Sequence, residues 1–113
     1  MKEPTIRFEE FQLLDIRIGT ISSVSEFPKA NKPAYQLIID FGTLGNRKSS
    51  AQITHLYRKD DLVGKQVLAV VNFLPRQIAN FVSEVLVLGV VDPASKVVLL
   101  QADKSIPNGG YIR

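Results

Sequence analysis

The chain has 113 residues, of which 45% are hydrophobic and 22% charged, with a formal net charge of +3. This composition is too apolar for a disordered chain, and it predicts a single domain over residues 1–113 whose core begins at roughly residue 8. The absence of cysteine excludes disulfides and Cys-ligated zinc, and no apolar run approaches the roughly 20 residues that a membrane helix needs. We expect a cytoplasmic protein without membrane insertion, mildly biased toward polyanionic partners.

The first predicted strand begins at segment 14–18, where apolar and polar residues alternate with the two-residue period of a half-buried strand. The apolar positions change parity by Ile21, which predicts a β-bulge at or near Gly19 and Thr20. A basic loop at 27–33, rich in turn-forming residues, should then separate this strand from the next.

The second predicted strand covers 35–41, where the alternation places Tyr35 on the core face. A turn at 42–46 leads to a polar third strand near 48–53. Short helical turns at 54–62 follow. The remaining strands are expected at 65–72, 84–91 and 96–101, with an irregular segment around Pro75. Five to seven short antiparallel strands with a helical insertion after the third predict an all-β, OB-type five-stranded barrel.

Three of these strands are apolar at odd and even positions alike, over Val67–Val71, Val85–Val91 and Val97–Leu100. The outer face of an antiparallel barrel is normally wet, so these strands need a cover on both faces. We therefore predict a homodimer, with the C-terminal segment containing Ile106 and Tyr111 as part of the cover.

Four segments in this order and spacing resemble the CsaA-type tRNA-binding domain, which is related to the C-terminal domain of some methionyl-tRNA synthetases and to the endothelial monocyte-activating polypeptide domain. The segments are LDIRIGTI at 14–21, SSAQIT at 49–54, GKQVLAVVN at 64–72 and PRQIANFVSEVLVLG at 75–89. The resemblance implies an OB-fold homodimer that binds tRNA without catalysis. It also implies a chaperone-like role in protein export, with unfolded or pre-secretory polypeptide as the partner.

The family's most characteristic binding-surface run corresponds to Asn72, Pro75, Arg76, Ser83 and Glu84. The chain departs from the wider family by carrying Asn80 and Val85 where glycine is usual, and Leu86 where methionine is usual.

Basic residues predict where phosphates would be bound, since phosphate contacts supply affinity without sequence discrimination. The candidates are Arg17, Lys29, Lys32, Arg47, Lys48 and Arg76. They could line one side of the barrel, or they could be scattered, solvated surface charges.

The loop after the apolar strand at 65–72 places Asn72 and Arg76 close together, where both can hydrogen-bond bases or phosphates. Ser83 and Glu84 return to the same end of the barrel, and Glu84 could instead form an ion pair with Arg76.

The aromatic residues Phe73 and Phe81 flank the Arg76 loop and are the candidates for base stacking, although burial in a core or dimer interface is the commoner role of phenylalanine.

The sequence does not favour an enzyme, a metal site or a cofactor. His55 is the single histidine, and one histidine without cysteine cannot supply a usual zinc site or a recognisable catalytic triad. We therefore expect a non-catalytic protein that docks tRNA or other structured RNA on a basic barrel face. The alternative is an export-related chaperone that binds polypeptide in exposed apolar grooves.

Overall fold

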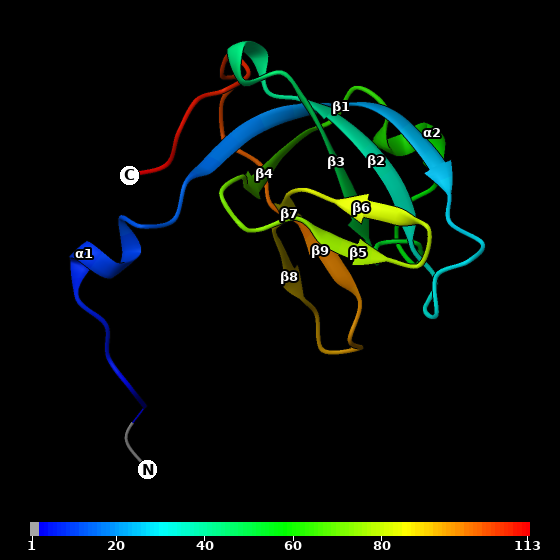
Figure 1. The fold of residues 1–113 in the computed structure, drawn as a ribbon, viewed down its shortest axis with the longest axis horizontal. Helices are drawn as coiled ribbons and strands as arrows, with labels where there is room; N and C mark the ends of the chain where they lie inside the picture. Colours follow the sequence, from blue (N-terminus) through cyan, green and yellow to red (C-terminus); the bar gives the residue numbers. More distant parts are fainter. Residues whose placement is uncertain (1–2) are drawn as a thin grey trace.

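The computed structural model describes residues 3–113. Its main sheet has five antiparallel strands in the order β3-β2-β1-β4-β7, and it curls until β3 meets the segment before β7 (Figure 1). These strands are β1 (Ile16–Glu26), β2 (Tyr35–Asp40), β3 (Asn46–Ala51), β4 (Gln66–Val70) and β7 (Leu86–Val87). The result is the predicted all-β five-stranded barrel, nearly closed.

Short elements complete the chain. They are α1 (Phe8–Phe11), η1 (Gly42–Leu44), α2 (Lys59–Leu62), the hairpin of β5 (Arg76–Ile78) and β6 (Phe81–Ser83), and the hairpin of β8 (Gly89–Val91) and β9 (Val97–Leu99). Nine strands are therefore found over residues 3–113 where five to seven were predicted. The segment expected to be irregular is the β5–β6 hairpin, whose three-residue strands are too short to show a period. None of the helices in residues 3–113 is long and apolar enough to cross a membrane.

The core confirms the alternation predicted for the second strand, because Tyr35, Leu37, Ile39 and Phe41 are all buried. The bulge predicted at or near Gly19 and Thr20 is found just after them, where the register of β1 against β2 shifts between Ile21 and Ser23. Gly19 has a different role. A Cβ built on it would lie 2.6 Å from Ile39 Cγ2 and 2.7 Å from Phe41 Cδ1, so glycine permits the core to pack directly against β1.

The barrel closes between β3 and residues 83–85 without a regular ladder, through bonds that largely use side chains. We call this set the closing seam. It consists of Glu84 N to Lys48 O (2.8 Å), Lys48 N to Glu84 Oε1 (2.9 Å), Ser50 N to Ser83 Oγ (3.0 Å) and Ser49 Oγ to Val85 O (3.0 Å). Closure therefore depends on which residues stand at these positions.

The C-terminal segment does not cover the apolar strands as predicted. It runs along β1 instead, with Gly109 N donating to Ile18 O at 2.7 Å and Ile112 N donating to Ile16 O at 2.9 Å. Because β2 pairs only with the later half of β1, this edge of β1 is free to bind the tail. The β8–β9 hairpin projects from the barrel (Figure 1), and Val90 and Val91 are 55% and 65% exposed.

Candidate nucleic-acid interface

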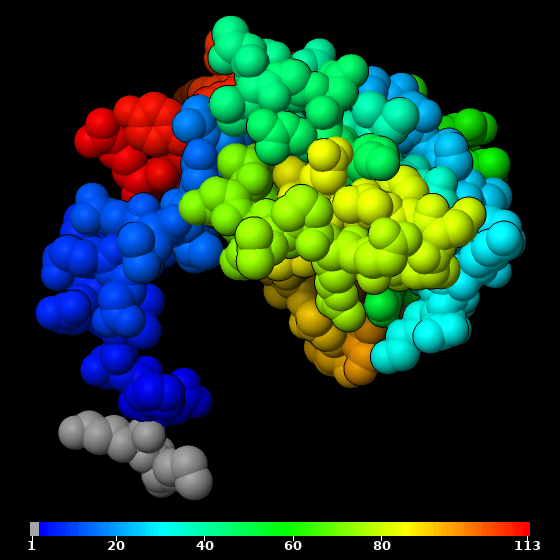
Figure 2. All heavy atoms as spheres, viewed as in Figure 1, coloured from blue at the N-terminus to red at the C-terminus, as the bar shows by residue number. Residues whose placement is uncertain are grey.

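A groove lies at the C-terminal end of β3, beside the β5–β6 hairpin. It consists of two adjoining hollows of about 660 and 510 Å³ that share Ser50, Arg76, Ile78 and Leu86. We call the two together the binding groove. Figure 2 shows the yellow-green hairpin spread over one face of the molecule, next to the cyan loop between β1 and β2. That loop contributes Lys32 to the second hollow.

Arg76 is the central cation of the binding groove. It begins β5 opposite Ser83, is exposed, and forms no ion pair within residues 3–113. The alternative of a structural ion pair with Glu84 is therefore not realised, since Glu84 accepts from the backbone N–H of Lys48 instead. An exposed guanidinium without a protein counter-charge is available to an external anion.

The first hollow is largely apolar. Phe73 and Leu86 are 47% and 48% exposed, and Leu74 is 92% exposed. Phe81, the other stacking candidate, packs against Phe27 with ring centroids 5.5 Å apart, and Lys48 Nζ lies 5.4 Å from its ring centroid. Of the two phenylalanines, only Phe73 lines the groove.

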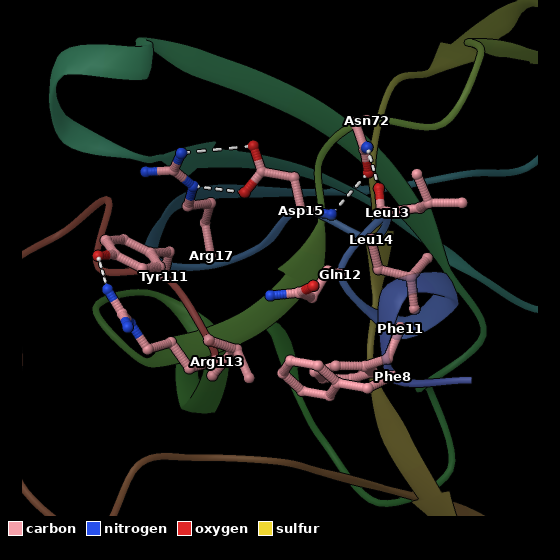
Figure 3. A pocket seen from close by; sticks show the side chains of 11 residues that line it. Phe8, Phe11, Gln12, Leu13, Leu14, Asp15, Arg17, Asn72, Tyr111 and Arg113 are labelled. Carbon is pink, nitrogen blue, oxygen red and sulfur yellow. Dashed lines mark hydrogen bonds and ion pairs between the residues drawn. The ribbon is translucent and has the colours of Figure 1, made fainter. Parts of the chain in front are cut away.

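Three of the predicted polar residues line the groove but also bond within the protein. Asn72 Oδ1 accepts from Asp15 N at 2.9 Å and Asn72 Nδ2 donates to Leu13 O at 2.8 Å (Figure 3). Ser83 and Glu84 belong to the closing seam. Their assignment as RNA ligands remains a prediction.

The predicted basic residues do not all share one face. In the register of β3 against β2, Lys48 lies opposite the partly exposed Ile38, whereas Arg47 lies opposite the fully buried Ile39. Neighbours along a strand point to opposite faces, so Arg47 lies on the barrel side of β3 and Lys48 on the outer side. Lys29 is exposed in the loop before Lys32 and lines neither hollow.

Arg17 lies apart from the binding groove, beside the N- and C-terminal segments. Its Nε donates to Asp15 Oδ1 at 2.6 Å and its Nη1 donates to Gly109 O at 2.9 Å. The hydrogen bond to Asp15 raises the pKa of Arg17 above its ordinary value, so this guanidinium stays charged at any pH at which the protein is studied. These contacts engage Arg17 in holding the tail against β1.

A third hollow, of about 690 Å³, lies between the N-terminal segment and the tail. We call it the arm pocket. Figure 3 shows Phe8 and Phe11 on one side and Tyr111 and Arg113 on another, with the amide of Gln12 between them. Asn72 lines both the arm pocket and the binding groove.

Sequence reasoning did not assign Ser50, Leu74 or Ile78 to the site, and it named Val85 and Leu86 only as departures from the family, although all five line the first hollow. The pair Ser49-Ser50 could have indicated Ser50, because adjacent residues of a strand point to opposite faces. One of the two serines must therefore face the core and the other the outside. Ser49 faces the core, fully buried, and Ser50 faces the groove. Within residues 3–113, no three His, Asp or Glu side chains gather as a metal site would require.

An antiparallel five-stranded barrel with a partly apolar, cationic groove beside its loops belongs to the OB-type class of binding domains. The family described as "Putative tRNA binding domain" matches residues 16–110, and the chain belongs to that family.

Two solved structures are similar over their whole length. The chaperone CsaA of Bacillus anthracis is 53% identical with a TM-score of 0.93, covering 97% of this chain and 100% of its own. The CsaA chaperone protein of Picrophilus torridus is 51% identical with a TM-score of 0.91, covering 96% and 100% respectively. These confirm the predicted resemblance and fold.

The chain is also 34% identical over 108 residues to the methionine–tRNA ligase of Parabacteroides distasonis, covering 96% of this chain. It spans only 16% of the length of that ligase. The similarity concerns this domain and not the remainder of the larger protein.

Proposed function

We propose that this protein binds tRNA, without a catalytic step, on the barrel face that contains the binding groove. The observation that carries the proposal is Arg76, an exposed cation that forms no ion pair within residues 3–113 and lines the groove of a chain that belongs to a tRNA-binding family. Lys32 adds positive charge in the second hollow, and Lys48 lies on the outer side of β3, two residues before Ser50. A cytoplasmic location is consistent with such a ligand.

Binding would proceed by electrostatic capture followed by docking on the shape of the RNA. Basic side chains displace counterions from the phosphates, so affinity should fall steeply as salt rises. The A-form RNA helix offers little sequence information to side chains, so selectivity for folded RNA would come from shape and from unpaired nucleotides.

We also propose that two copies associate through the N-terminal segment 3–15, which we call the arm, and the C-terminal segment, or tail. The N-terminal segment stands away from the barrel (Figure 2), and it exposes Ile6, Phe8 and Leu13 to 67%, 63% and 74%. Burying such side chains would remove apolar area from water. Sedimentation equilibrium at micromolar concentration should give twice the chain mass, and a monomer would contradict this.

Polypeptide binding is the second candidate function, favoured by the exposed Phe73, Leu74 and Leu86 and by the chaperone name of two similar structures. Apolar contacts are not screened by ions, so this mode predicts affinity that changes little with salt.

The test is fluorescence anisotropy with labelled tRNA over a salt series, with an unfolded polypeptide as competitor. Replacing Arg76 by alanine should weaken binding and reduce the steepness of the logarithmic salt plot by about one. Arg58→Ala is the matched control, because Arg58 is exposed and precedes α2, outside the groove. Equal salt slopes for the two variants would show that the groove is not the RNA surface.

A further inference from the structure

We propose that the binding groove holds one unpaired nucleotide of the RNA, and that Glu84 selects bases that carry an amino group. This rests on the proposed RNA binding and adds what the groove recognises. The inference comes from the arrangement of an exposed aromatic ring, a free guanidinium and a fixed carboxylate around one hollow.

The apolar part of the hollow suits the face of a base. Phe73, Leu86 and Ile78 line it together, and its volume of about 660 Å³ exceeds what one nucleotide base fills. Bases in a duplex have their faces buried against neighbours, so only an unpaired base can offer a face to Phe73. Stacking on an aromatic side chain tolerates every base and gives affinity without choice between them.

The cations Arg76 and Lys32 suit the phosphates that accompany the base. Arg76 lines both hollows of the groove and makes no ion pair within residues 3–113, so a phosphate can take its bidentate hydrogen bonds. Lys32 lines the adjoining hollow, where the next phosphate along a strand would lie. This charge favours a nucleotide over an uncharged apolar peptide segment.

Glu84 discriminates between bases that carry an amino group and bases that do not. Its Oε1 accepts from Lys48 N at 2.9 Å and its own N–H donates to Lys48 O at 2.8 Å, so the residue is fixed at both ends. Its second carboxylate oxygen makes no hydrogen bond within residues 3–113, and it can only accept. Cytosine, adenine and guanine have amino groups to donate to it, whereas uracil places carbonyl oxygens on either side of its one N–H.

The experiment compares ribonucleotide hexamers of cytidine and uridine, which carry equal charge and similar rings. The wild-type protein should bind the cytidine hexamer about tenfold more tightly. Glu84→Gln retains an oxygen for Lys48 N and adds a donor, so it should abolish the preference while circular dichroism stays unchanged. Phe73→Ala should weaken both hexamers by about tenfold, with Leu56→Ala as the control, because Leu56 is an exposed apolar residue outside the groove.

A hexamer of N4,N4-dimethylcytidine tests the same point on the unaltered protein, since it lacks the amino hydrogens. It should bind as weakly as the uridine hexamer. Equal binding of all three hexamers, with tRNA still bound, would overturn the selection by Glu84 and leave the proposed function standing. Displacement of the bound hexamers by an unfolded polypeptide would identify the groove as a peptide site. Absence of tRNA binding would overturn both proposals.

Discussion

Replacing Asn72 by alanine should release the N-terminal arm while leaving the barrel folded. The side chain makes two hydrogen bonds to the arm, at 2.9 Å to Asp15 N and 2.8 Å from its amide to Leu13 O. Each such bond contributes about 0.5–1.5 kcal/mol net, and because water can reach these exposed groups we expect a total of about 1 kcal/mol. β1 should stay in place, since Val71 N still donates to Asp15 O.

Hydrogen–deuterium exchange measured by mass spectrometry would report this release. A change of about 1 kcal/mol in the opening of the arm corresponds to about a fivefold faster exchange in the segment ending at Asp15, with residues of β2 unaffected. Asn80→Ala is the control, because Asn80 is an exposed amide in the β5–β6 turn. Unchanged exchange of the arm together with a large loss of tRNA affinity would show that Asn72 serves the RNA and not the arm.

Two further predictions concern the stability of the barrel, measured by urea unfolding. Gly19→Ala should destabilise it by about 1–3 kcal/mol, because the new methyl group would overlap Ile39 and Phe41, and a loss below 0.5 kcal/mol would contradict this close packing. Ser49→Ala should cost about 1–3 kcal/mol, since Ser49 is fully buried and Val85 O would lose the nearer of its two hydroxyl donors, keeping only Ser83 Oγ at 3.4 Å. Ser22→Ala removes an exposed bond of the same kind and should change stability by less than about 0.5 kcal/mol.

The sequence predicts those parts of the fold in which the hydrophobic period is long enough to read. In the six-residue strand β2 every second residue is buried as predicted, and Ile38 is the one apolar residue on its outer face. The three-residue strands β5 and β6 are too short for any period, and Ala79 turns between them with φ at +51°, which composition alone does not indicate. The bulge lies just after the predicted residues and not at Gly19 itself, because a glycine in a strand signals either a bulge or a close approach, and Gly19 serves the second purpose.

The sequence predicts which residues lie close together at the candidate site, but not which of their polar groups are free to bind a ligand. Chain order places Asn72, Arg76 and Glu84 at one end of the barrel, and all three line the first hollow. Whether a polar side chain faces a ligand or bonds within the protein depends on backbone atoms distant in the sequence, such as Asp15 N for Asn72 and Lys48 N for Glu84. No pattern in the sequence reports those partners.

The closing seam explains why the site and the fold share residues. A ladder made of backbone groups tolerates most side chains, but here Ser83 Oγ and Glu84 Oε1 replace backbone carbonyls as acceptors opposite β3. The same two side chains line the binding groove. A substitution that alters recognition at Glu84 therefore also weakens barrel closure, unless the new side chain retains an acceptor oxygen at the same reach. Glutamine meets this requirement and alanine does not, so binding measured on an alanine variant would mix a change in recognition with a change in fold.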